Sequence, residues 1–241
     1  MIPIRDNIRR QHFPVMTWLL IALNVAAWLY ELRIVRRAPE NVDSFIYQFG
    51  VVPARFTRPD WAAWVGFPPG GKLAFLTSMF LHGGWLHLLG NMWTLRLFGD
   101  DVEDRMGPLR FLIFYLLCGF AAMGVHVLTN PDSMVPVLGA SGAIAGVMGA
   151  YYLMFRQARI VLIVPPFFWL FEIPALLYLA FWFFSQVGSG TLSAARGGDA
   201  GGVAWWAHVG GFIAGMATFW LFVRRDRWRA DDPGYVPARG A

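Results

Sequence analysis

Six stretches of this chain are apolar enough to cross a lipid bilayer as helices, a crossing that takes about 20 residues each. They cover residues 15–32, 83–99, 109–128, 135–155, 170–187 and 203–223. Hydrophobic residues make up 57% of the chain and charged residues only 15%, against roughly 25% charged in soluble domains. Because lipid cannot satisfy exposed backbone groups, such spans must be helices. The sequence therefore predicts an all-α membrane protein with six transmembrane helices in one domain.

The segments between the spans differ in character. The loop at 33–82 mixes aromatic residues with prolines and glycines, so we expect it to lie in the membrane interface, where aromatic rings are favoured. Residues 157–169 include Pro165 and Pro166, which cannot sit inside a helix, and we expect an interfacial loop there. The glycine-rich stretch 188–202 is typical of a mobile loop.

Basic residues indicate the orientation of the spans. If the N-terminus is cytoplasmic, thirteen of the 20 Lys and Arg residues fall on the cytoplasmic side, which is the side that normally carries the excess. The arginines at 33–37, directly after the first span, favour the opposite orientation. We therefore expect a cytoplasmic tail at 1–14, a six-helix domain at 15–223 and a second cytoplasmic tail at 224–241.

Several other classes of protein are disfavoured. Cys118 is the only cysteine, which excludes an intrachain disulfide and a cysteine-based metal site. His82 and His87 lack the spacing and the glutamate of a zinc-protease motif, so we expect no metal and no cofactor. The basic residues flank the spans without forming a basic module, so nucleic acid is not an expected partner. The first span follows basic residues as in a signal peptide, but no clear cleavage site follows, and we expect it to be retained.

Four polar side chains lie inside the apolar spans. His87 and Asn91 are four residues apart in the second span and share a helix face, Ser141 is in the fourth span, and His208 is in the sixth. These three spans run the same way through the membrane. At 1.5 Å per residue, Ser141 and His208 would each lie on the order of 10 Å inside their helix starts. Polar groups gathered at one depth of a bilayer indicate a functional site.

Glycines offer a way to bring the fourth and sixth spans together. Both spans carry a Gly-x-x-x-Gly motif, at 142–146 and at 211–215. Such spacing lets two membrane helices pack with their backbones nearly touching. This packing could bring the Ser141 hydroxyl within hydrogen-bond reach of His208.

A paired serine and histidine favour hydrolysis through a serine nucleophile. His208 is the base whose chemistry suits removal of the Ser141 proton near neutral pH, and His87 and Asn91 could donate to an oxyanion. No Asp or Glu lies at this depth in the three spans, so a dyad is expected rather than a triad. Each residue also has a structural interpretation, as a core histidine, an interhelical clamp or a packing contact, but their shared depth favours a site.

The same residues resemble the motifs of the rhomboid family of intramembrane serine proteases. The resemblance covers the second to sixth spans, in the expected order. The matching segments are 82–91, 99–107, 139–142 and 207–211 with Gly215, and the opening at 2–6 is similar to bacterial members.

This resemblance implies a six-helix bundle in which Ser141 is the nucleophile and His208 the general base. His87 and Asn91, with the Ser141 amide, would line the oxyanion hole. Substrates would be single-span membrane proteins, cleaved near the outer membrane face at small residues in helices that unwind easily. The fifth span and the 188–202 loop would form a gate and cap. The location implied is the cytoplasmic membrane of a bacterium.

Two features depart from the family. Some members stack a tyrosine, four residues after the serine, on the catalytic histidine, and this chain has Ala145 there. A Trp-Arg pair seen in the first loop of some members has no clear equivalent. The alternative function is a catalytically silent rhomboid-like protein that binds membrane clients, which would not need both Ser141 and His208. A small transporter would show an internal repeat and mid-membrane polar residues, and neither is evident.

Overall fold

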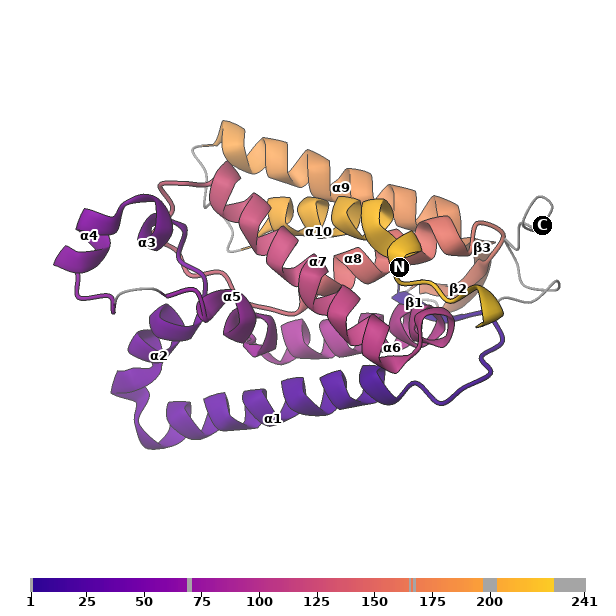
Figure 1. Cartoon of the computed structure of the whole chain (residues 1–241), viewed down its shortest axis with the longest axis horizontal. Helices are drawn as coiled ribbons and strands as arrows, with labels where there is room; N and C mark the ends of the chain where they lie inside the picture. The colour runs from indigo at the N-terminus through magenta and orange to yellow at the C-terminus, as the bar shows by residue number, and fades with distance from the viewer. Residues whose placement is uncertain (1, 69–70, 165, 167, 197–202, 228–241) are drawn as a thin grey trace.

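The chain folds into a bundle of helices that lie side by side, as the computed structural model shows (Figure 1). The structure describes residues 2–68, 71–164, 166, 168–196 and 203–227. Among them, the helices of 14 residues or more are α1 (Val15–Arg37), α6 (Trp85–Met106), α7 (Pro108–Thr129), α8 (Ser141–Met154), α9 (Ala175–Ala195) and α10 (Trp205–Thr218). Each corresponds to one predicted span, so the predicted helical membrane bundle is confirmed.

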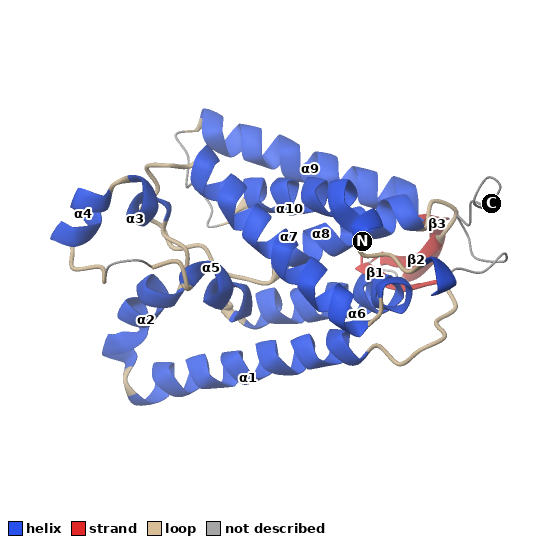
Figure 2. Cartoon of the chain, viewed as in Figure 1, coloured by secondary structure: helices blue, strands red, loops and turns tan. Residues whose placement is uncertain are grey.

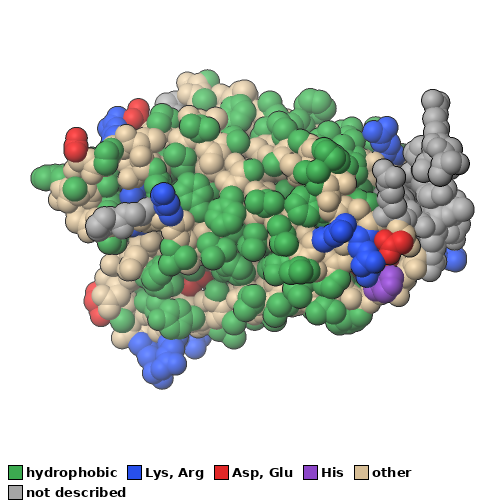
Figure 3. All heavy atoms as spheres, in the orientation of Figure 1, with side chains coloured by type: hydrophobic (Ala, Val, Ile, Leu, Met, Phe, Trp, Pro, Cys, Tyr) green, Lys and Arg blue, Asp and Glu red, His purple; other side chains and the backbone are tan. Residues whose placement is uncertain are grey.

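The molecular surface suits a lipid environment. On the face in Figure 3, hydrophobic side chains cover the middle of the molecule, and charged side chains gather toward its two ends. Large apolar side chains point outward, including Leu86, which is 87% exposed, and Phe181, which is 69% exposed. By length and composition, α1, α7 and α9 can each cross a membrane, and α8 is a shorter apolar helix. Exposure of so many large apolar side chains is unfavourable in water but not in lipid.

Four helices begin later than the sequence predicted, α6 and α10 by two residues and α8 and α9 by more. α8 begins at Ser141 instead of 135, because the preceding residues turn: Gly139 has a φ of 124°, a conformation that L side chains rarely adopt. α9 begins at Ala175 instead of 170 and continues to Ala195. The expectation of a loop at 188–202 is therefore wrong for residues 188–195, and residues 197–202 lie outside the described part of the chain.

The helices α8 and α10 are each shorter than the hydrocarbon layer of a bilayer. Each has 14 residues, or about 21 Å at 1.5 Å per residue, against about 30 Å of hydrocarbon. Ser141 is the first residue of α8, and His208 lies in the first turn of α10. The predicted depth of about 10 Å inside both helices is thus wrong, although the two residues still share a depth because both stand at helix starts.

A small antiparallel sheet closes one end of the bundle (Figure 2). Its strands, in the order β1-β2-β3, are β1 (Ile2–Asp6), β2 (Arg159–Val164) and β3 (Trp169–Pro174). The sequence analysis did not predict this sheet, since it placed 157–169 in a loop and 1–14 in a tail. The run from Ile160 to Val164 is rich in the β-branched residues that favour strands.

The first loop folds into short helices at the opposite end of the bundle (Figure 1). They are η1 (Pro39–Asn41), α2 (Val42–Phe49), α3 (Pro53–Thr57), α4 (Pro59–Trp64), α5 (Ala74–Thr77) and η2 (Ser78–Phe80). Arg55 holds this region together. Its guanidinium donates to the carbonyl oxygens of Gln48 and Pro68, at 3.3 and 3.0 Å, and lies over the Phe67 ring. A buried arginine thus organises the loop that lacks the Trp-Arg pair.

An acidic segment at the end of α6 fastens the start of α1. Glu103 accepts hydrogen bonds from the backbone N–H groups of Met16 and Thr17, at 2.9 and 2.7 Å, and from the Thr17 hydroxyl. These amides belong to the first turn of α1, which has no intrahelical acceptor for them, and a carboxylate there also complements the helix dipole. Asp104 likewise binds the backbone N–H groups of residues 11 and 12.

Replacing Glu103 by alanine is expected to lower the melting temperature of the protein in detergent by several degrees. The variant leaves buried donors at the start of α1 unsatisfied, which costs about 1.5–3 kcal/mol. Glu172→Ala is the matched control, because it removes a carboxylate from an exposed ion pair with Arg159. Such a pair contributes only about 0–1 kcal/mol to the free energy of unfolding. Equal shifts in both variants would contradict the role of Glu103.

Candidate active site

Ser141 and His208 meet between α8 and α10. The Ser141 hydroxyl oxygen Oγ lies 2.8 Å from His208 Nε2, a good hydrogen-bond distance. Both side chains are partly buried and line one cavity. A hydroxyl that donates to an imidazole nitrogen can pass its proton to that nitrogen as it attacks an electrophile. The arrangement can therefore carry nucleophilic chemistry at Ser141.

Glycines set the distance between the two helices, as the sequence predicted. A Cβ added at Gly211 would collide with the carbonyl oxygen of Gly142, and one added at Gly215 would collide with that of Gly146. One turn further on, an added Cβ at Gly149 would strike the Phe212 backbone. The α8 and α10 backbones are thus in direct contact, and only hydrogen in place of each side chain permits it.

His87 stands on α6 opposite the start of α8. The Gly83 N–H donates to His87 Nδ1 at 3.4 Å, which places the ring proton on Nε2. That Nε2 lies against Gly139: a Cβ added to this glycine would be 2.7 Å from His87 Nε2 and 3.6 Å from Ser141 Oγ. The Nε2–H donor thus faces the space beside the serine hydroxyl.

Asn91 lies one turn after His87 and lines the same cavity. Its Nδ2 donates to His82 Nε2 at 3.0 Å, which uses one of the two amide hydrogens. The backbone N–H of His82 is in turn held by both carboxylate oxygens of Glu31 on α1, at 3.2 and 3.3 Å. The second Nδ2 hydrogen of Asn91 therefore remains for a ligand in the cavity, with the amide plane fixed by His82.

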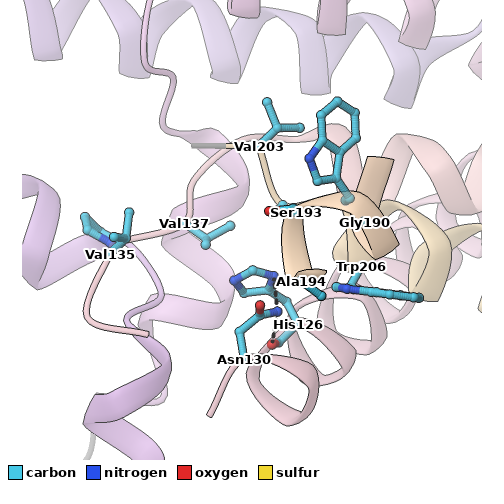
Figure 4. Close-up of a pocket in the computed structure, with 12 residues that line it drawn as sticks. His126, Asn130, Val135, Val137, Gly190, Ser193, Ala194, Val203 and Trp206 are labelled. Atoms are coloured by element: carbon cyan, nitrogen blue, oxygen red, sulfur yellow. Dashed lines mark hydrogen bonds between the residues drawn. The ribbon is translucent and has the colours of Figure 1, made fainter. Parts of the chain in front are cut away.

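The cavity that holds these four side chains measures about 740 Å³. Glycines 83 and 84, the segment 137–138 and residues 203–204 form much of its wall. A smaller hollow of about 40 Å³, shown in Figure 4, continues it past Val137 and Val203. His126 and Asn130 supply polar groups to this hollow, and its size admits a few water molecules at about 10–15 Å³ each.

Sequence reasoning missed the side chains that hold His208 from the other side. Gln186 on α9 lies 2.8 Å from His208 Nδ1, and the Trp182 ring is tilted by 34° over the imidazole at 5.9 Å. A glutamine inside an apolar span is itself a signal for a site, because lipid penalises it. Sequence reasoning also assigns no supporting role to His82, although His82 opens the 82–91 segment that contains His87 and Asn91.

Comparison with known proteins identifies relatives. Residues 69–225 match the Rhomboid domain. The chain is 28% identical over 168 residues to RHOMBOID-like protein 5 of Arabidopsis thaliana, covering 70% of this chain and 50% of that protein. It is 32% identical over 144 residues to the putative rhomboid protease YdcA of Bacillus subtilis, covering 59% and 63%. Rhomboid protein 1, mitochondrial, of Saccharomyces cerevisiae is 28% identical over 159 residues, covering 62% and 41%. The matched region thus spans about half of the length of these relatives.

Gly211→Ala is expected to disturb the site by forcing α10 away from α8. The added methyl group would overlap the Gly142 carbonyl, and overpacking of this kind costs about 1–3 kcal/mol. The melting temperature in detergent and the rate of Ser141 labelling by a fluorophosphonate should both fall. Gly124→Ala, in the middle of α7 with open space around the new methyl, is the control and should match wild type. Unchanged labelling of Gly211→Ala would show that the close approach does not position the pair.

Proposed function

Since the chain belongs to the rhomboid family, we propose that it is an intramembrane serine endopeptidase that cleaves single-span membrane proteins. It is an integral membrane protein, and its family acts on membrane proteins in lipid. The single observation that carries the proposal is the 2.8 Å hydrogen bond between Ser141 Oγ and His208 Nε2. Its location at the starts of two short helices supports hydrolysis below the outer membrane surface.

In the proposed reaction Ser141 attacks the carbonyl carbon of the scissile peptide bond. His208 Nε2 takes the hydroxyl proton as the Oγ–C bond forms. The same nitrogen then delivers that proton to the leaving amine, and the C–N bond breaks to give an acyl-enzyme. A dyad suffices for both transfers, since one imidazole acts first as base and then as acid.

Three donors surround the position of the developing oxyanion. They are His87 Nε2–H, the free Nδ2–H of Asn91 and the backbone N–H of Ser141. The last belongs to the first turn of α8, where amides lack intrahelical acceptors and the helix dipole favours negative charge. Donors that are fixed before the reaction stabilise the charge without reorganisation, which is often the largest contribution to catalysis.

Hydrolysis of the acyl-enzyme needs water inside the membrane domain. The hollow beside His126 and Asn130 adjoins the catalytic cavity and has polar groups that can hold water. A water molecule from there can lose its proton to His208 as it attacks the acyl carbon. The Oγ–C bond then breaks, the product leaves with a new C-terminal carboxyl group, and His208 returns the proton to Ser141 Oγ. A substrate segment that unwinds easily, such as one with glycine, would expose its peptide bond most readily.

We place the catalytic domain at residues 15–223 of a bacterial cytoplasmic membrane protein. The distribution of basic residues supports cytoplasmic placement of 1–14 and 224–241, most of the latter lying outside the described residues. This orientation sets the Ser141 end of the bundle toward the outer face. Cleavage would then occur near the outer ends of substrate spans.

Purified wild type in detergent is expected to cleave a reporter transmembrane substrate, whereas Ser141→Ala is expected to be inactive. A serine-directed fluorophosphonate should label wild type, and His208→Ala should lose most of this labelling because the hydroxyl lacks its base. Gel analysis of both reactions provides the measurement.

Equal cleavage by wild type and Ser141→Ala would reject the protease mechanism. If wild type bound transmembrane segments without cleaving them, the client-binding alternative would stand instead. Undiminished labelling of His208→Ala would remove His208 as the activating base.

Asn91→Ala is expected to lower kcat by about 10²-fold with little change in KM, because the lost donor acts on charge that exists only in the transition state. Steady-state cleavage of the reporter substrate measures both constants. Thr94→Ala is the control on the same helix, since its exposed hydroxyl donates to the Gly90 carbonyl of its own helix. A wild-type kcat in Asn91→Ala would exclude the amide from the oxyanion hole.

A further inference from the structure

We propose that Gln186 on α9 is the positioning residue for His208: it selects the imidazole tautomer that lets Nε2 act as the base. The inference rests on the proposed function and extends it to a third helix. His208 has the α8 hydroxyl at one ring nitrogen and Gln186 at the other, with distances of 2.8 Å on both sides. Ala145 offers no ring to stack on the imidazole, so the restraint must come from elsewhere in the bundle.

The hydrogen bonds of Gln186 fix which end of its amide faces His208. Its Nε2 donates to the Ser185 hydroxyl at 3.0 Å and to the Trp182 carbonyl at 3.3 Å. The Ser185 hydroxyl itself donates to the same Trp182 carbonyl at 2.6 Å. Reversing the amide would put the Gln186 oxygen against that carbonyl, two acceptors facing each other. The amide oxygen Oε1 is therefore the atom that meets the imidazole.

An amide oxygen can only accept, so the partner nitrogen must donate. His208 Nδ1 therefore carries the ring proton, and in a neutral imidazole the other nitrogen, Nε2, then has a free lone pair. That lone pair faces the Ser141 hydroxyl. The opposite tautomer would present an N–H to the serine and could not take its proton. Gln186 thus does for the tautomer what a carboxylate does in a triad, without adding a charge.

The packing of α9 on α10 holds Gln186 in place. Its side chain is 7% exposed, and Gly190, one turn later, lets the helices approach closely. A Cβ added at Gly190 would lie 3.3 Å from Trp205 Cβ and 3.2 Å from the Trp206 ring. The Trp182 ring, one turn before Gln186, covers one face of the imidazole. Two successive turns of α9 therefore restrain the position and the rotation of His208.

The surroundings of His208 leave Gln186 as the group that sets its tautomer. The titratable side chains that act on the imidazole electrostatically are His87 on α6 and His126 on α7. No carboxylate is among the described residues that line the cavity. Trp182 and Trp205 contact the ring through their aromatic faces and edges, which cannot distinguish Nδ1 from Nε2.

The test compares Gln186→Met, which keeps the length but removes the acceptor, with Gln186→Glu, which keeps an acceptor. We expect Gln186→Met to lower kcat about tenfold at unchanged KM, with an equal drop in the rate of fluorophosphonate labelling. Gln186→Glu should keep kcat within about threefold, and the acidic limb of its pH-rate profile should move to higher pH, because a carboxylate favours the imidazolium. Leu117→Met, at an exposed position of α7 away from the cavity, is the control and should behave as wild type.

A second measurement decides the tautomer without activity. The ¹⁵N signals of wild-type histidines, assigned by comparison with His208→Gln, should show a protonated Nδ1 at His208, and Gln186→Met should lose this preference. A proton on Nε2 in wild type, or wild-type kcat and pH profile in Gln186→Met, would overturn the proposal. If wild type neither cleaves substrate nor reacts with fluorophosphonate, the proposed function fails, while the nitrogen signals still test the role of Gln186.

Discussion

Direct backbone contact between α8 and α10 is the constraint on which the rest of the structure depends. Lipid offers helices no hydrophobic reason to associate, so their attraction comes from close packing and polar contacts. The glycines at 142, 146, 211 and 215 allow that closeness, and an alanine at Gly211 or Gly215 would strike a carbonyl oxygen. Since Ser141 and His208 stand at the starts of the two contacting helices, the same packing that stabilises the bundle sets their separation. Stability and the geometry of the site therefore cannot be varied independently at this interface.

Much of the fold could be predicted because lipid imposes a simple rule on sequence. Long apolar runs must be helices, and all six predicted runs contain one. The ends of the helices were harder to predict. The residues before Ser141 are as apolar as the helix itself, and only Pro136 and Gly139 indicate a turn there. The sheet was missed because its strands pair segments far apart in the chain. Register between such segments depends on tertiary contacts that hydropathy does not report.

The candidate site was visible in the sequence where polar residues interrupt apolar spans. Ser141, His208, His87 and Asn91 share one cavity, and their catalytic roles stay predictions. Gln186 was overlooked because the search for a partner of His208 considered only carboxylates and only three spans. A neutral amide on a fourth helix satisfies the same geometric need at lower desolvation cost, since it brings no charge into the membrane. The side chain that contacts a given histidine depends on how each helix is rotated about its own axis. In a span that is apolar on all sides, the hydrophobic periodicity does not reveal this rotation.

The sheet that closes one end of the bundle ties the order of synthesis to the order of assembly. β1 lies at the edge of the described sheet and pairs with β2, and Asp6 accepts a hydrogen bond from the Tyr151 hydroxyl, 145 residues further along the chain. During translation, β1 therefore has no strand to pair with while four helices enter the membrane. The β1–β2 pairing can form only after residues 159–164 leave the ribosome. Contacts of such long sequence separation form late and slowly. The pairing of β1 with β2 is therefore expected to be one of the last steps of folding, after those four membrane helices have packed together.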